Sequence, residues 1–139
     1  MLKYYEVFCG KDSTDMSNTT ESLEMYLENI LLLQNNIGRV RSIDIAHKTG
    51  YSKPSVSRAV KLLQKDTCIE IDEDGYIPLT EKGREIASKI LDRHKIISDF
   101  FKSLGVDEKT ASEDACRIEH VISDESFEKL KNFISKDNV

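Results

Sequence analysis

Apolar residues recur along most of this chain with the spacing of amphipathic helices. The densest pattern predicts a helix over 21–35 that is buried on much of its surface, with apolar positions at Leu23, Met25, Tyr26, Leu27, Ile30, Leu31 and Leu33. Further helices are expected over 42–48, from 53 to about 63, and from 81 to about 103. Two more are expected over 107–121 and 124–135, after a break at Gly105.

Polar residues mark where these helices begin, and a hairpin separates two of them. Ser42, Ser52 and Thr80 each precede a periodic stretch and are expected to be N-caps. The segments 68–72 and 76–79 are short and either alternating or β-branched, and the polar turn 73–75 joins them. This pattern predicts a β-hairpin between the third and fourth helices.

The helices over 42–63 have the spacing of a helix-turn-helix motif. Ala46 is small where the two helices would cross, Gly50 follows four residues later in the turn, and Val56 lies six beyond that. The motif needs this order, because only a small residue lets the helices approach and glycine enters a left-handed turn without strain. The predicted fold is therefore mainly α, with an N-terminal winged helix-turn-helix, a β-hairpin wing and a C-terminal helical domain.

Charge is distributed unevenly along the chain. The net charge is −5, yet residues 39–66 contain seven basic and two acidic side chains, whereas residues 106–139 contain nine acidic and five basic ones. A basic segment that includes a helix-turn-helix favours double-stranded DNA as the partner, with the start of the second helix in the major groove. The predicted DNA contacts are Arg39, Arg41, Ser52, Lys53, Ser55, Ser57, Arg58 and Lys61.

Composition argues against several other classes. At 32 % charged and 39 % hydrophobic residues the chain is typical of a globular protein, and its longest apolar run, 30–33, is too short to span a membrane. Three widely spaced cysteines do not suggest a disulfide framework, which favours the cytoplasm. No nucleophile–base pair or phosphate-binding loop is evident, so we expect neither an enzyme nor a small-molecule substrate.

A cluster of metal-binding side chains lies near the C-terminus. Cys116, Glu119 and His120 are spaced i, i+3 and i+4, so on one helix a thiolate, a carboxylate and an imidazole share a face. All three bind divalent transition metals. Far upstream, Met25 and Glu28 also share a helical face that could meet them.

Several segments, in the same order, resemble one known family. The segments are 23–28 (LEMYLE), 53–57 (KPSVS), 79–84 (LTEKGR), 93–94 (RH) and 115–120 (ACRIEH). They are similar to the diphtheria toxin repressor and manganese transport regulator family of metal-dependent repressors. The resemblance implies a winged-helix DNA-binding domain over 19–80 and a helical metal-binding and dimerisation domain over 81–139, connected by the helix 81–103. Residues 1–18 fall outside the resemblance and are expected to be an N-terminal extension.

The resemblance also implies the metal ligands. Met25, Cys116, Glu119 and His120 match the primary site of iron-type members, whereas Glu28 and His94, with Glu119 shared, match the second site of manganese-type members. Ser98 and Ser112 stand where the iron-type ancillary site has ligands. Because a thiolate and a thioether favour softer ions, we expect Fe(II), with Mn(II) as the alternative and Zn(II), Co(II) or Ni(II) as substitutes in vitro.

The expected function is a homodimeric repressor of metal-uptake genes that binds a palindromic operator when metal-loaded. Two alternatives stay open at this point. One is a thiol redox sensor, or a small metalloenzyme, that uses Cys116. The other is a winged-helix regulator that senses a small organic molecule, or a plain interaction module, neither of which would respond to a chelator.

Overall fold

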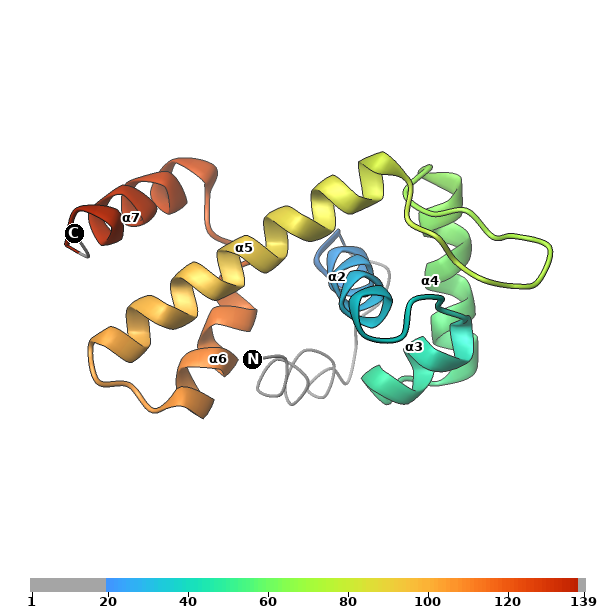
Figure 1. Cartoon of the computed structure of the whole chain (residues 1–139), viewed down its shortest axis with the longest axis horizontal. Coiled ribbons are helices and arrows are strands. Elements are labelled where there is room, and N and C mark those ends of the chain that lie inside the picture. The colour runs from blue at the N-terminus through green and yellow to red at the C-terminus, as the bar shows by residue number, and fades with distance from the viewer. Residues whose placement is uncertain (1–19, 138–139) are drawn as a thin grey trace.

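The long helix α5 connects the two halves of the molecule (Figure 1). The computed structural model describes residues 20–137, so the predicted extension 1–18 lies outside the described residues. The helices in chain order are α2 (Thr20–Ile37), α3 (Ser42–Thr49), α4 (Lys53–Lys65), α5 (Glu81–Ser103), α6 (Glu108–Ile118) and α7 (Asp124–Asp137). Helix α2 packs against α3, α4 and α5, while α6 and α7 pack against α5. Across 20–137, no helix combines the length and apolar character needed to cross a bilayer.

The helix-turn-helix forms as predicted, with one different cap. Gly50 ends α3 at φ +78°, and its N–H donates to the Ala46 carbonyl at 2.9 Å. Ser52 caps α4 by accepting from the Ser55 N–H at 3.3 Å. The prediction that Ser42 caps α3 is wrong. The cap is Arg41, one residue earlier, and Ser42 is already the first helical residue. The Asp44 carboxylate accepts from the Arg41 backbone N–H at 2.9 Å, which is the reciprocal half of a capping box.

The predicted β-hairpin wing is only partly formed. Within residues 20–137 no strand is present; two isolated antiparallel bridges, Arg41 with Tyr76 and Ile69 with Leu79, take its place. Glu70 donates to the Pro78 carbonyl, but proline has no N–H to return the bond. Asp72 donates to the Tyr76 carbonyl, but the Tyr76 N–H bonds to the Asp72 side chain instead of its backbone. Each pair therefore lacks one of the two bonds that a continuous ladder requires.

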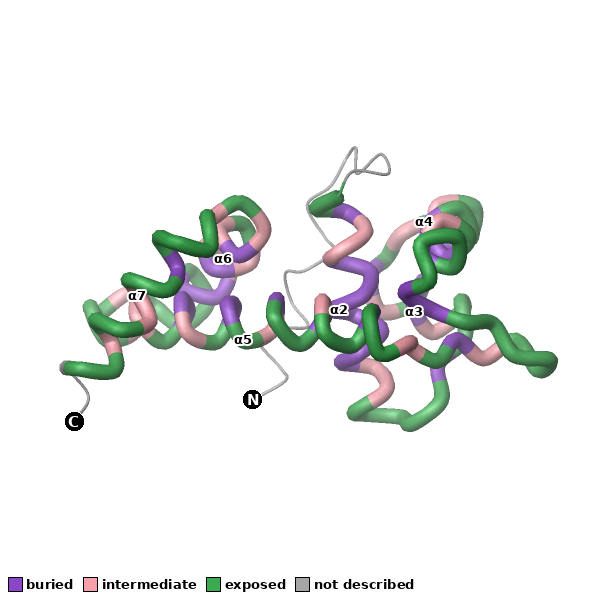
Figure 2. The backbone as a smooth tube through the Cα atoms, turned by 90° about the horizontal axis from the view of Figure 1, so that it is seen from above, coloured by how far each residue is buried: buried purple, intermediate pink, exposed green. Residues whose placement is uncertain are grey.

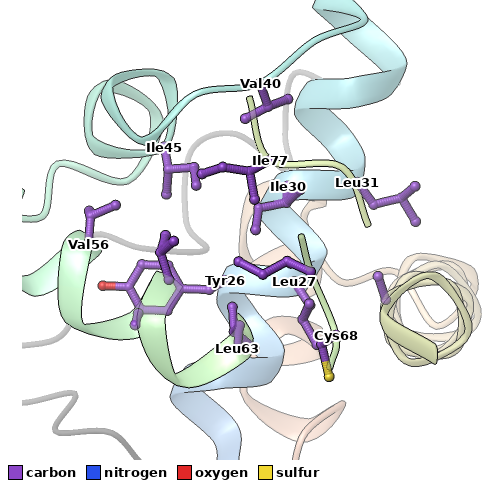
Figure 3. Close-up of a cluster of buried hydrophobic side chains, with 14 of the residues drawn as sticks. Tyr26, Leu27, Ile30, Leu31, Val40, Ile45, Val56, Leu63, Cys68 and Ile77 are labelled. Carbon is purple, nitrogen blue, oxygen red and sulfur yellow. The ribbon is translucent and has the colours of Figure 1, made fainter. Parts of the chain in front are cut away.

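A hydrophobic core joins α2 to α3, α4 and the wing (Figure 3). Helix α2 carries an unbroken buried stretch over 25–32, visible along its middle in Figure 2. Gly83, in the first turn of α5, is required by close packing, because a Cβ there would lie 2.0 Å from the Cys68 carbonyl oxygen. The Thr80 hydroxyl donates to the Thr67 carbonyl at 2.6 Å. These contacts attach the start of α5 firmly to the DNA-binding half.

A smaller core lies at the other end of α5. It is formed by Ile97, Ala115 and Phe127, from α5, α6 and α7. Ile97 is only 1 % exposed, so it belongs to the interior of the subunit. Phe133 on α7 remains 56 % exposed, and Leu104 after α5 is 65 % exposed.

Candidate metal centre and DNA-binding surface

Three side chains converge between the two halves. Glu28 from α2 meets Glu119 and His120, which follow α6, and one ligand atom of each lies within 4.8 Å of the others. Helix α6 was predicted to continue to 121 but ends at Ile118. Glu119 nevertheless keeps helical angles, and its N–H donates to the Ala115 carbonyl at 2.9 Å. The spacing inferred from sequence therefore survives although the helix ends earlier.

The two carboxylates at this point are fully buried, and Glu28 is the less compensated of the two. Glu28 and Glu119 are both 0 % exposed, and neither oxygen of Glu28 has a hydrogen-bond partner. Burial raises the pKa of Glu28 to about 7. Burial, followed by the charge of Glu28, raises the pKa of Glu119 well above its usual value. Removing a charged carboxylate from water is costly unless a cation or hydrogen bonds replace the solvent.

The third group, His120, is oriented by a carboxylate on α2. Its Nδ1 lies 3.2 Å from Glu24 Oε1, while its Nε2 lies 3.3 Å from Glu119 Oε1. A histidine whose Nδ1–H donates to a carboxylate presents Nε2 to a metal, the arrangement common in metalloproteins. Glu24 also lines an open pocket of about 370 Å³ with Lys89, Arg93 and Asp124, which gives this side of the centre a connection to solvent.

Arg93 ties the end of α6 to α5 and α7. Its guanidinium donates to the carbonyls of Glu119 and Ile122, at 3.2 and 3.0 Å, and pairs with Asp124 at the start of α7. The side chain is buried and lies over the Phe127 ring, 5.2 Å from its centroid. By capturing these carbonyls, Arg93 accounts for the early end of α6 and holds the segment that carries Glu119 and His120.

His94 contacts the centre through Glu119. Its Nδ1 lies 2.8 Å from Glu119 Oε2, and its Nε2 lies 3.4 Å from Ser112 Oγ. The ring is 3 % exposed, and burial lowers the pKa of His94 to about 3. A neutral imidazole has one N–H to donate, and Glu119 is the acceptor at the shorter distance.

The two sulfur-containing side chains predicted as ligands, Met25 and Cys116, make other contacts in this structure. Met25 is 2 % exposed on α2, three residues before Glu28, and its sulfur accepts a hydrogen bond from the Tyr51 hydroxyl at 3.5 Å. Cys116 is half-buried and packs against Leu32. Its sulfur is disulfide-bonded in this structure, which the wide spacing of the cysteines did not predict. A thiolate ligand would require that bond to be reduced.

The donor set fits a divalent cation. Glu28 and Glu119 supply charge, His120 supplies a neutral nitrogen, and Glu28 is a fully buried carboxylate without a hydrogen-bond partner. Carboxylate oxygens and imidazole nitrogens bind Mn(II), Fe(II) and Zn(II). A cation here would compensate the buried charge and join α2 to the end of α6.

The predicted DNA contacts on α4 form a polar, outward-facing surface. Ser52 Oγ donates to Ser55 Oγ at 2.9 Å, and Arg58 donates to Ser55 Oγ at 3.3 Å, so the first turns of the helix hold a hydroxyl–guanidinium cluster. The remaining predicted contacts on this helix are exposed: Lys53, Ser57 and Lys61. This arrangement suits phosphate and base-edge contacts at the N-terminal part of a recognition helix.

The two predicted contacts before α3 lie against the wing. The guanidinium carbons of Arg39 and Arg41 lie 4.1 and 4.3 Å from the centroid of the Tyr76 ring. Arg39 also pairs with Asp72 at 3.6 Å. Both arginines are exposed, so the stack holds the wing and still presents positive charge at the surface.

Sequence reasoning missed Glu24 and Arg93. Glu24 lies four residues before Glu28 and thus on the same face of α2, a signal that was available. Arg93 directly precedes His94, but nothing local indicates that its partners are backbone carbonyls 26 and 29 residues away.

Comparison with known proteins agrees with this architecture. Residues 18–79 match the iron dependent repressor N-terminal DNA binding domain, and residues 80–138 match the iron dependent repressor metal binding and dimerisation domain. Both are domains of transcriptional regulators and not of enzymes.

Individual relatives agree with the domain matches. An HTH-type transcriptional regulator of Methanocaldococcus jannaschii is 41 % identical over 119 residues, covering 84 % of this chain and 95 % of the relative. MntR of Bacillus subtilis is 32 % identical over 116 residues, covering 84 % and 82 %. The solved manganese regulator SloR has a TM-score of 0.73 at 31 % identity; the match covers 81 % of this chain but only 53 % of SloR, about half its length. The chain therefore belongs to the diphtheria toxin repressor and manganese transport regulator family of metal-dependent transcriptional repressors.

Proposed function

We propose that this chain is an Fe(II)-responsive repressor that binds a palindromic operator as a homodimer and controls metal-uptake genes from the cytoplasm. One observation carries the proposal. Glu28, in the DNA-binding half, is a fully buried carboxylate, and it faces Glu119 and His120 from the other half. A cation bound by these three would connect the two halves through the charge that each one buries.

We assign a different role to each half of the molecule. Residues 19–80 read DNA through Arg39, Arg41 and the first turns of α4, and residues 81–139 complete the metal site and form the dimer. Binding of a cation would restrict the angle between α2 and α6, and in a dimer this sets the separation of the recognition helices. Because operator half-sites recur at about 34–36 Å, a modest change of angle alters the fit. A preference of about 2–3 kcal/mol for the DNA-competent arrangement changes affinity by roughly one to two decades.

The preference for Fe(II) depends on two sulfur ligands. We propose Met25 and reduced Cys116 as ligands beside Glu28, Glu119 and His120, since a thioether and a thiolate favour Fe(II) over Mn(II). Mn(II) is the second candidate, because the three groups that already converge are oxygen and nitrogen donors. One of the similar solved structures, SloR, is also described as a manganese regulator.

An anaerobic selection experiment tests this function. The full chain, kept reduced, is mixed with a randomised duplex pool in Fe(II), Mn(II) or EDTA, and the retained DNA is sequenced. We expect a palindromic sequence to be enriched in Fe(II), and its affinity, measured by fluorescence anisotropy, to fall about ten- to a hundredfold on chelation. Glu119→Gln should abolish the metal response, whereas Glu128→Gln, at an exposed position on α7, should retain it.

Each other outcome identifies a different regulator. Equal enrichment in EDTA would reject metal control and favour a metal-independent winged-helix protein. Activation of DNA binding by Mn(II) but not by Fe(II) would show that the protein is a manganese-responsive repressor. Release of DNA on oxidation in the presence of EDTA would favour a redox sensor that uses Cys116.

A further inference from the structure

The loop between α4 and α5, which forms the wing, carries only negative charge. Residues 67–79 contain four acidic side chains and no basic one, and the four are Glu70, Asp72, Glu73 and Asp74. All four are exposed, and the loop projects from the edge of the molecule in Figures 1 and 2. Among residues 20–137, Asp72 is the one member of this set that forms an ion pair, and its partner is Arg39. Because phosphates repel unpaired carboxylates, the tip of the loop, residues 73–75, is poorly suited to lie against DNA.

Two positive charges lie at the base of this loop, over a single aromatic ring. The guanidinium carbons of Arg39 and Arg41 are 4.1 and 4.3 Å from the centroid of the Tyr76 ring. In the part of the chain that the structure describes, one carboxylate pairs with them: Asp72 Oδ2 lies 3.6 Å from Arg39 Nη2. Like charges repel at short range, and one carboxylate balances only one of the two guanidiniums. The group is therefore short of one negative charge, which an anion such as a phosphate would supply.

The backbone of the loop holds the Tyr76 ring at this place. Asp72 Oδ1 accepts from the backbone N–H groups of Asp74 and Tyr76, both at 2.9 Å. Gly75, between these two residues, has φ +84°, a left-handed value that glycine adopts without strain. Tyr76 then pairs with Arg41 in an antiparallel bridge. The ring is thus fixed by contacts within the protein.

Stacking on this ring leaves both guanidiniums able to bind phosphate. A guanidinium that lies over a ring uses its flat face, whereas its N–H groups point outward from its edge and match the oxygens of a phosphate. Both arginines are exposed, and within residues 20–137 neither guanidinium donates a hydrogen bond. Stacking also restricts two flexible side chains, so less conformational entropy is lost when DNA binds.

We infer that the wing binds the DNA backbone through its base and not through its tip: Arg39 and Arg41 contact phosphates, and Tyr76 is a positioning residue that holds both guanidiniums. Arg41 also caps α3, which packs against α4, so the pair flanks the helix-turn-helix. The acidic tip then faces away from the phosphates. This inference rests on the DNA binding that belongs to the proposed function, and not on which ion activates it.

A salt series on the reduced, Mn(II)-loaded full chain tests the two arginines. Affinity for a fluorescein-labelled duplex of mixed sequence is measured by fluorescence anisotropy, since phosphate contacts do not depend on sequence. For Arg39→Ala combined with Arg41→Ala we expect the slope of log affinity against log salt to become shallower by about 1.8, for two phosphate contacts. Lys95→Ala, exposed on α5, should leave the slope unchanged. An unchanged slope in the double variant would overturn the inference.

Variants that keep the charge test the role of Tyr76. Tyr76→Phe retains the ring and should bind like wild type, whereas Tyr76→Leu should lose about three- to tenfold in affinity, with a shallower salt slope, because the stack is lost. Arg39→Lys combined with Arg41→Lys should show a similar loss at constant charge, because an ammonium lacks the flat face and the forked donors. The lysines replace exposed residues, so this pair decides the matter if thermal unfolding shows that Tyr76→Leu is not folded. Wild-type binding by either folded variant would overturn the positioning role.

A combined variant shows whether Tyr76 acts through the arginines. In the background of Arg39→Ala and Arg41→Ala, Tyr76→Leu should cause no further loss of DNA affinity, since the groups that it positions are already absent. A further loss as large as that in the wild-type background would show that Tyr76 acts independently of the arginines, and would overturn the positioning role.

Neutralising the tip tests the other half of the inference. In Glu73→Gln combined with Asp74→Asn we expect DNA affinity to change by less than about threefold at physiological salt, because charges more than about 8 Å from the phosphates are screened. A greater gain in affinity, with a steeper salt slope, would place the tip beside the phosphates and overturn the inference. Glu128→Gln, exposed on α7, is the control for loss of a distant negative charge.

Repeating the titrations in EDTA separates failure of this inference from failure of the proposed function. Equal wild-type affinity in Mn(II) and EDTA, with the variants still different from wild type, would reject metal control alone. A metal response with wild-type salt slopes in every variant would reject the inference alone. Absence of binding to any duplex by folded protein would reject both.

Discussion

The two buried sides of α2 differ in what completes them. On one side Tyr26 and Ile30 pack into an apolar core with α3, α4 and the wing. On the other, Glu28 is equally buried but meets another carboxylate and has no hydrogen-bond partner. The first side is complete with protein atoms alone, whereas the second becomes electrostatically balanced when a cation or protons are added. The contrast explains how one helix can belong to a stable DNA-binding unit and to a metal-dependent junction.

The free energies expected for the two sides of α2 support this contrast. Burying a large aliphatic or aromatic side chain contributes about 1.5–3 kcal/mol, and the apolar side of α2 contributes several of them. A buried carboxylate without a partner costs several kcal/mol or takes up a proton. The DNA-binding core should therefore fold without metal, and the metal should act on the arrangement of the two halves.

Removing part of the apolar core should have the largest effect on stability. Leu63 on α4 is 1 % exposed, so Leu63→Ala is expected to destabilise the protein by about 2–5 kcal/mol, with or without metal. Urea unfolding measures this. Ile71→Ala, at a wing position that is 40 % exposed, should cost much less. Equal losses at the two positions would contradict the assigned core.

Removing the charge of Glu28 should abolish the stabilisation that the metal provides. Wild type is expected to gain about 2.7 kcal/mol at a metal concentration a hundred times the dissociation constant. Glu28→Gln should lose this gain while the metal-free variant is at least as stable as wild type, because a buried carboxylate is replaced by a neutral amide. Thermal unfolding with and without Mn(II) measures both quantities. Glu21→Gln, in the exposed first turn of the same helix, is the control. A full metal response in Glu28→Gln would remove Glu28 from the centre.

Metal affinity should decrease as the pH falls below neutrality. The pKa of Glu28 is raised to about 7 and the pKa of Glu119 is also raised, so below pH 7 a proton occupies a carboxylate that the metal needs. Affinity is expected to fall about tenfold per pH unit for each proton displaced. Mn(II) titrations on both sides of neutrality, in buffers of different ionisation enthalpy, measure the affinity and the protons released. An affinity independent of pH below neutrality would mean that the carboxylates are already ionised without the metal.

Removing one cation from α4 should have the smallest effect, confined to DNA binding. Arg58→Ala should lower the slope of log affinity against log salt by about 0.9 if Arg58 contacts one phosphate. Its metal affinity and stability should remain those of wild type, since Arg58 is exposed. Fluorescence anisotropy over a salt series measures the slope, and Lys95→Ala, exposed on α5, is the control. An unchanged slope would place Arg58 away from the phosphates.

Local sequence patterns were sufficient to predict the helices and part of the candidate metal centre. Periodicity and caps located the helix-turn-helix, and the spacing of Glu119 and His120 placed them together. The wing departed from prediction because Pro78 lacks an N–H and the Asp72 side chain takes the Tyr76 N–H, details that a count of β-branched residues does not capture. The Glu24–His120 contact joins residues 96 apart, and the two engaged nitrogens of His94 depend on three helices packing together. Such pairings follow from tertiary packing, which periodicity does not specify.

Anomalous diffraction tests the central claim most directly. Crystals of the reduced full chain are grown with Mn(II) or Fe(II), and data are collected at the absorption edge of the ion. The account predicts an anomalous peak within bonding distance of Glu28, Glu119 and His120. Metal-saturated crystals with a peak only at other side chains would contradict it.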